Sequence, residues 1–208
     1  MGRLFKKFSH LFLLSLLALQ PTQGSALTDR QATAIVKDPA ITTGMALSEY
    51  KGISLIGLAP PVGEKFDVPI VEPAQALKVI SEALALIEGG SAFSKSQIER
   101  LKKKGPVTIV YDPRYPDKMS NMASVQVALF SPHYFKRARQ LTFLVIVSRH
   151  GVKWPVKELA AVIVHELVGH GIQHLNNRWG KMRLIDMECE PWLYEEMAYQ
   201  SLEMDKFS

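Results

Sequence analysis

Several features that would narrow the choice of fold are missing from this sequence. Among its 208 residues there is a single cysteine, Cys189, so an internal disulfide is excluded. Internal repeats and low-complexity tracts are also lacking, which argues against a solenoid. With 47% hydrophobic and 22% charged residues, the composition is that of a globular protein and not of a disordered one. The apolar run Leu11–Leu19 is shorter than the roughly 20 residues that a membrane-spanning helix needs. A globular protein without disulfides remains.

Acidic residues are absent from the first 26 positions, whereas Arg3, Lys6 and Lys7 lie there. These three account for most of the net charge of +5, because the rest of the chain has 22 basic and 20 acidic residues. The body of the protein therefore lacks the basic excess that is typical of nucleic-acid-binding proteins. We expect no nucleic-acid partner.

The N-terminal segment has the three-part layout of a secretory signal peptide. A basic start is followed by the apolar run Leu11–Leu19 and by a polar tail that ends in Gly24-Ser25-Ala26. The small residues of this tail suit cleavage after Ala26. We predict that residues 1–26 are a signal peptide and residues 27–208 a single domain. The protein would be secreted or periplasmic, without a stable membrane anchor once the leader is cleaved; an uncleaved leader that acts as an anchor is the alternative.

The spacing of apolar residues in the mature chain predicts an α+β fold. Glycines and prolines punctuate residues 27–73, which favours turns and short strands. The later elements expected in chain order are helices from 73 to the glycine pair at 89–90 and over 94–104, strands at 107–111, 124–130 and 141–148, and helices at about 155–175 and 190–205. Residues 143–147 are continuously apolar, so their strand is expected to be central.

Three of the six histidines lie within ten residues, His165–His174. In the zinc-peptidase motif H-E-x-x-H, two histidines four positions apart share one helix face. Here His165-Glu166 is followed by His170, five positions after the first histidine. On a regular α-helix this spacing turns the two side chains about 140° apart. A regular helix would therefore not bring both imidazoles to one metal ion.

A single π-helical turn would remove this conflict. In such a turn the hydrogen bonds run from residue i to i+5, so residues five apart lie nearly above one another. Gly169 is a suitable place, because glycine tolerates irregular backbone and has no side chain that could clash. We therefore predict a π-bulge near Gly169 that brings His165 and His170 to one metal ion.

The segment His165–His170 reads H-E-x-x-G-H and resembles the motif of the dipeptidyl peptidase III family, which are gluzincin-type zinc peptidases. The resemblance implies that His165 and His170 bind zinc and that Glu166 is the general base that activates water. It also implies a small zincin-like domain, with a short twisted sheet, an active-site helix and a C-terminal helix that carries a ligand. The chain is far smaller than that family's enzymes, so the resemblance concerns the chemistry of the site.

A catalytic zinc needs three protein ligands and one open position. Gluzincins take the third ligand from a glutamate on a following helix. Glu188 is favoured, because Glu188-Cys189 resembles the pair in which the dipeptidyl peptidase III family supplies its ligand. Glu195 is the alternative, since it begins a Glu-x-x-Ala pattern similar to that of several other gluzincins. Pro191 counts against Glu188, because proline suits the start of a helix better than its middle.

His174 offers another ligand set. With His165 and His170 it would resemble the all-histidine zincins, although their glycine turn before the third histidine is missing. Cys189 is a weaker candidate, because thiolates favour closed structural sites. A stabilising donor for the oxyanion is also needed. The candidates, which the sequence does not rank, are His150, His174, Tyr194 and Tyr199.

These residues predict an exported zinc-dependent peptidase with one zinc ion per chain and a peptide or protein substrate. The strand at 124–130 is our candidate for the edge that pairs with an extended peptide. Two other functions stay open. One is a non-catalytic envelope protein with a structural zinc site, closed by Cys189 or His174 as a fourth ligand. The other is a zinc amidase that cleaves a non-peptide or cell-wall amide.

Overall fold

The computed structural model describes residues 45–60, 63–116, 127–131, 133–135 and 140–204. The predicted signal peptide, its cleavage site and the first part of the strand predicted at 124–130 lie outside these ranges. None of the described helices is both long enough and apolar enough to cross a bilayer.

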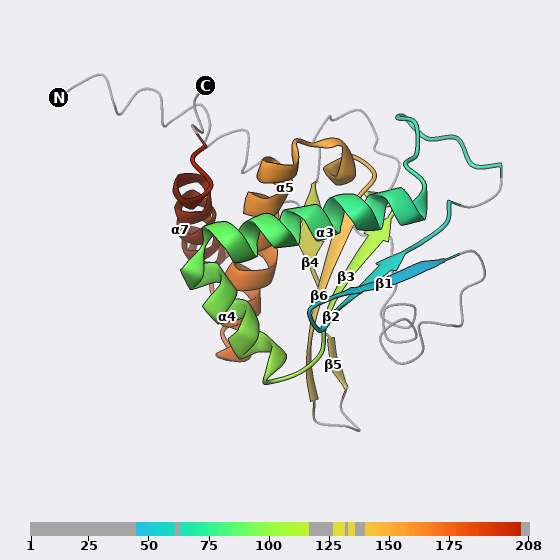
Figure 1. The fold of residues 1–208 in the computed structure, drawn as a ribbon. Coiled ribbons are helices and arrows are strands. Elements are labelled where there is room, and N and C mark those ends of the chain that lie inside the picture. The colour runs from blue at the N-terminus through green and yellow to red at the C-terminus, as the bar shows by residue number, and fades with distance from the viewer. Residues whose placement is uncertain (1–44, 61–62, 117–126, 132, 136–139, 205–208) are drawn as a thin grey trace, which may run out of the picture.

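A mixed β-sheet forms the centre of the described structure, with strand order β1-β2-β3-β6-β4 (Figure 1). β2 and β3 are parallel, as are β3 and β6, whereas β1, β4 and β5 each pair antiparallel with their neighbour. β6 lies between β3 and β4, which confirms the central position predicted for its apolar run. The strands are β1 (Ala46–Tyr50), β2 (Ile53–Gly57), β3 (Val107–Asp112), β4 (Ala128–Phe130), β5 (His133–Phe135) and β6 (Gln140–Ser148).

The helices follow the predicted order. They are α3 (Pro73–Gly90), α4 (Ala92–Lys102), the short 3-10 helix η2 (Gly151–Lys153), α5 (Val156–Ile163), the π-helix η3 (Val164–His170), α6 (Gly171–Leu175) and α7 (Leu184–Ser201). Pro73 occupies the first turn of α3, where its missing N–H costs no hydrogen bond. The Ser91 side chain caps α4 by accepting a hydrogen bond from the Ser94 N–H. α5, η3 and α6 follow one another without a break, which confirms the long helix predicted to end at Leu175.

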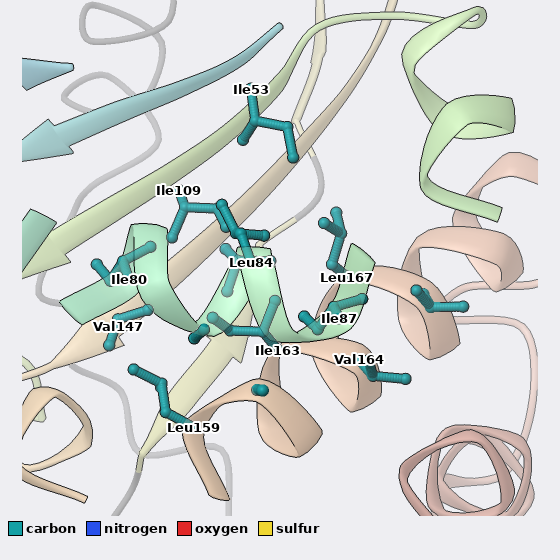
Figure 2. Close-up of a cluster of buried hydrophobic side chains, with 14 of the residues drawn as sticks. Ile53, Ile80, Leu84, Ile87, Ile109, Val147, Leu159, Ile163, Val164 and Leu167 are labelled. Atoms are coloured by element: carbon teal, nitrogen blue, oxygen red, sulfur yellow. The ribbon is translucent and has the colours of Figure 1, made fainter. Parts of the chain in front are cut away.

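The helices pack against one face of the sheet. Alternate residues of β3 and β6 point to opposite faces, so Ile109 and Val147 join the main hydrophobic core, whereas Val110 joins a smaller second cluster. Figure 2 shows Leu84 of α3 and Ile163 of α5 in the same core as Ile109. Within the described residues, helices contribute to the main core only. This separation of helices to one face supports the predicted α+β class.

Two features of the chain path differ from the sequence-based prediction. β2 belongs to the same sheet and runs parallel to β3, with α3 and α4 forming the crossover between them. The predicted start of the last helix near Glu190 is wrong, because α7 begins at Leu184 and has Pro191 in its interior. The earlier start places Glu188 on this helix.

Candidate metal centre

The helix that carries the H-E-x-x-G-H segment contains the predicted irregularity. Val164–His170 is a π-helix between α5 and α6. The ring centroids of His165 and His170 lie 5.1 Å apart, with the planes at 76°. The prediction that a π-turn brings together two imidazoles five positions apart is therefore confirmed.

A carboxylate from α7 meets these two rings. Oε2 of Glu188 lies 3.1 Å from Nε2 of His165 and 3.6 Å from Nε2 of His170. One donor atom from each residue lies within 4.8 Å of the other two, which is close enough for all three to bind one metal ion. The three residues are buried, with 8% of His165, 4% of His170 and 7% of Glu188 exposed. Glu188, the favoured third ligand, thus joins both histidines.

The lone pairs of His165 and Glu188 face each other and require a positive charge between them. Nδ1 of His165 lies 2.8 Å from Oε2 of Glu195, so this nitrogen donates a hydrogen to the carboxylate. In a neutral imidazole, Nε2 then carries a lone pair, and this lone pair faces an oxygen of Glu188. The two repel each other unless a proton or a cation lies between them. Two imidazole nitrogens and one carboxylate oxygen are a ligand set found in catalytic zinc sites, so the residues fit zinc.

Without a metal ion, a proton supplies this charge. Burial lowers the pKa of His165, but its hydrogen bonds to Glu188 and Glu195 outweigh burial and raise the pKa above the ordinary value of 6.5. Burial likewise raises the pKa of Glu188, but its hydrogen bond to His165 and its close contact with His170 bring the pKa below the ordinary value. Both directions favour an imidazolium beside a carboxylate when no metal ion is bound.

Metal binding is consequently expected to release a proton from His165. Because its pKa is raised, the imidazole keeps its proton to a higher pH than an ordinary histidine, and zinc affinity should increase with pH across the neutral range. Zinc titrations by calorimetry in buffers of different ionisation enthalpy measure the number of protons released, which should be about one. Equal zinc affinity at pH 6.5 and pH 7.5 would contradict this expectation.

We call the three candidate ligand atoms of His165, His170 and Glu188 the donor group. Glu195 lies on the other side of the His165 ring from this group. Its carboxylate accepts from Nδ1, whereas Nε2 faces Glu188. A carboxylate in this position holds the ring in one orientation and makes Nε2 more basic. Glu195, the alternative third ligand, therefore contacts a candidate ligand from outside the group of three.

Replacement of Glu195 tests this supporting role. We expect Glu195→Gln to weaken zinc binding by about 10- to 100-fold, because the negative charge beside Nδ1 of His165 is lost. Glu196→Gln is the matched control, since it removes the same charge from the next position of α7, where the side chain contacts Gln200. Competition with a chromophoric chelator measures both affinities. Equal zinc affinities of the two variants would contradict the supporting role of Glu195.

Glu166, the predicted general base, is held by the edge of the sheet. Its Oε2 accepts a hydrogen bond of 2.7 Å from the Phe130 N–H. In the β4–β6 ladder, Ser131 donates to Leu144, so the preceding N–H of Phe130 points away from β6 and towards η3. Sequence reasoning missed this contact, because the pairing of distant segments decides it. It fixes one oxygen of Glu166 and leaves Oε1 as a second proton acceptor.

Gly169 lies at a tight contact between the π-helix and α7. A Cβ atom at this position would be 2.5 Å from Cβ and 2.6 Å from Cα of Pro191. Gly169 is not among the residues with positive φ, so its backbone conformation is open to any residue. Of the two predicted reasons for glycine, the absence of a side chain is the one that matters in the structure.

The close approach predicts a large effect of Gly169→Ala. Because Cα of Pro191 is a backbone atom, α7 would have to move, and we expect a loss of about 1–3 kcal/mol in the free energy of unfolding. Gly89→Ala is the control, since this helical position of α3 has open space and alanine favours helix by up to about 1 kcal/mol. Chemical denaturation of both variants measures the difference. A Gly169→Ala variant as stable as the parent would contradict the packing argument.

The residues considered for a fourth ligand point elsewhere. The ring of His174 packs edge-on against Phe130 and Phe143, at centroid distances of 5.9 and 5.8 Å. Cys189 is exposed, although its neighbour Glu188 is buried. Within the described ranges, the donor group has three members. The all-histidine set and the closed four-ligand set therefore receive no support from this geometry.

Three of the candidate oxyanion donors are occupied by other carboxylates. His150 faces Asp67 at 3.3 Å. The Tyr194 hydroxyl donates to Glu190 at 2.9 Å, and the Tyr199 hydroxyl donates to Glu158. The fourth, His174, lies among aromatic rings.

Two further residues contact His170 that sequence reasoning did not select. The Trp179 ring packs against the imidazole at 4.7 Å between centroids, with the planes at 81°. Oε1 of Gln173 lies 3.1 Å from Nδ1 of His170. Gln173 follows His170 by three positions, a spacing that places two side chains on one helix face, and this was the available signal.

Comparison of the chain with models of protein families, with curated proteins and with solved structures gives no match. The function must therefore be argued from the residues of the site.

Proposed function

We propose that this protein is a zinc-dependent peptidase of gluzincin-like design, with His165, His170 and Glu188 as zinc ligands and Glu166 as general base. The observation that carries the proposal is the π-helix Val164–His170, which brings both imidazoles to the carboxylate of α7. A π-helical turn of this kind is common at functional sites.

The ligand set favours zinc with an open position. Two imidazoles and a carboxylate make three protein ligands, as in catalytic zinc sites, whereas structural sites are closed by four. When bound, zinc lowers the pKa of a coordinated water towards about 7 and polarises a carbonyl group. With three donors in the described part of the chain, the geometry supports a catalytic role over the structural-zinc alternative.

Two contacts of Glu166 support its role as the general base. It is the neighbour of His165 in the π-helix, and the Phe130 N–H holds its Oε2. The partly exposed carboxylate can take a proton from water and pass it to the departing amine. The hydrogen bond from Phe130 keeps the side chain in place while the proton moves.

The edge strand β4 supports a peptide as the substrate. β4 ends the strand order of the described sheet, and it contacts the π-helix. The alternation of an antiparallel ladder turns the backbone groups of Ala128 and Phe130 away from β6. An extended peptide could pair with these groups, apart from the Phe130 N–H that Glu166 already uses.

The N-terminal segment indicates where the proposed peptidase would act. The basic start, the apolar run Leu11–Leu19 and the small residues before position 27 support export, with the peptidase acting in the periplasm or outside the cell.

A digest tests the proposed activity. The mature chain, residues 27–208, is loaded with zinc and incubated with a peptide library, and the products are identified by mass spectrometry. We expect cleavage that a chelator abolishes and added zinc restores. An intact library would reject the peptidase proposal, and release of amines from cell-wall material by the same sample would favour the amidase alternative.

A further inference from the structure

Gln173 connects the two helices that carry the metal ligands. The residue is fully buried, with 0% of its surface exposed. Its Oε1 lies 3.1 Å from Nδ1 of His170, and its Nε2 donates a hydrogen bond of 2.7 Å to the Met187 carbonyl. The side chain thus contacts a proposed ligand on one side and the backbone of α7, beside Glu188, on the other.

The Met187 carbonyl is available to Gln173 because of Pro191. In an α-helix, each carbonyl accepts a hydrogen bond from the N–H four residues later. For Met187 that residue is Pro191, which has no N–H. The Met187 carbonyl therefore lacks its usual helical donor, and the buried Gln173 side chain donates to it instead. This explains why α7 continues through a proline that was expected to lie near its start.

The same hydrogen bond determines which way the Gln173 amide points. Only the NH2 end of the amide can donate to a carbonyl, so its oxygen must face His170. An amide oxygen only accepts, and Nδ1 of His170 must therefore carry a hydrogen. In the neutral ring, the lone pair is then on Nε2, which is the nitrogen that faces Glu188.

We propose that Gln173 is a positioning residue that holds His170 in the tautomer needed for metal binding, and that Pro191 sets the orientation of Gln173. Gln173 thus does for His170 what Glu195 does for His165. The inference rests on the proposed metal centre, and it does not depend on which bond the enzyme cleaves.

Two substitutions at position 173 separate positioning from packing. Gln173→Met and Gln173→Glu both remove the hydrogen bond to the Met187 carbonyl, so both should lower the free energy of unfolding. Only Gln173→Glu keeps an acceptor for Nδ1 of His170. We expect Gln173→Met to bind zinc about 10- to 100-fold more weakly than the parent, and Gln173→Glu to bind it at least as tightly.

Pro191→Ala provides a second background in case the first variant folds poorly. Alanine returns an N–H that can bond to the Met187 carbonyl, and it keeps the Cβ that packs against Gly169. We expect Gln173→Met with Pro191→Ala to regain stability and to remain weak in zinc binding. Nitrogen-15 chemical shifts of the zinc-loaded parent should show His170 with hydrogen on Nδ1.

Zinc alone is the probe, and competition with a chelator measures its affinity for each full-length mature chain. Equal zinc affinity of the Gln173→Met and parent proteins overturns the inference, as does an equal loss in the methionine and glutamate variants. A parent protein that binds no zinc overturns the metal centre, and the proposed function with it. Zinc binding that falls only in Gln173→Met, combined with a failed peptide digest, rejects the peptidase and leaves the positioning role intact.

Discussion

The purified protein is expected to carry about one zinc ion per chain, and His170→Ala should lose it. Removal of one imidazole leaves one nitrogen and one carboxylate oxygen, which cannot hold the ion as three donors do. The loss should exceed the roughly 10- to 100-fold effect expected for residues that only support a ligand. Metal analysis after dialysis, together with chelator competition, measures both the stoichiometry and the change in affinity.

His174→Ala is the matched control for this experiment. The control removes the same side chain from the same helix, but its ring packs against Phe130 and Phe143 and lies outside the donor group. It should keep about one zinc ion even if its stability falls. A correctly folded parent protein without bound metal, and unable to take up zinc, would count decisively against the metal centre.

The second large effect concerns the general base. Glu166→Gln is expected to keep zinc and to lower the rate of peptide hydrolysis by about 10²- to 10⁴-fold, because an amide does not accept the proton of the attacking water. Glutamine has nearly the same shape, and its oxygen can still accept the hydrogen bond from Phe130. Rates with a cleaved library peptide and zinc content, measured on one sample, separate catalysis from metal binding.

Glu82→Gln controls for the loss of one negative charge, since Glu82 is an exposed residue of α3. This variant should hydrolyse the peptide as fast as the parent protein. If Glu166→Gln turns over substrate at the parent rate, Glu166 is not the base. If it loses zinc as well as activity, its carboxylate contributes to metal binding and the assignment of roles must change.

The sheet and most helix boundaries could be predicted because they depend on local patterns. Phe143–Val147 of β6 is apolar on both faces, and the structure buries both faces at the centre of the sheet. α3 begins at Pro73 and ends at Gly90, as the proline at its start and the glycine pair at its end predict. The parallel pairing of β2 with β3 was not predictable in this way, because the local pattern of a strand does not say which distant strand it pairs with.

Local sequence patterns also did not determine which glutamate joins the two histidines. Glu188 and Glu195 both had patterns in their favour, and Pro191 argued against Glu188. The structure joins Glu188 to both histidines and puts Glu195 on the far nitrogen of His165. The argument from proline failed because a side chain from another helix, Gln173, replaces the missing backbone donor.

The spacing of His165 and His170 by itself determined that this helix must depart from regular α-helical geometry if both imidazoles are to share an ion, because the rotation per residue is fixed by backbone hydrogen bonding. Only the tertiary structure decided which carboxylate joins them and which side chains orient them. Those contacts come from the way α7 and β4 pack against the π-helix, and Gly169 permits the tight contact with Pro191 of α7. Such packing depends on the shape of surfaces that are far apart in the chain.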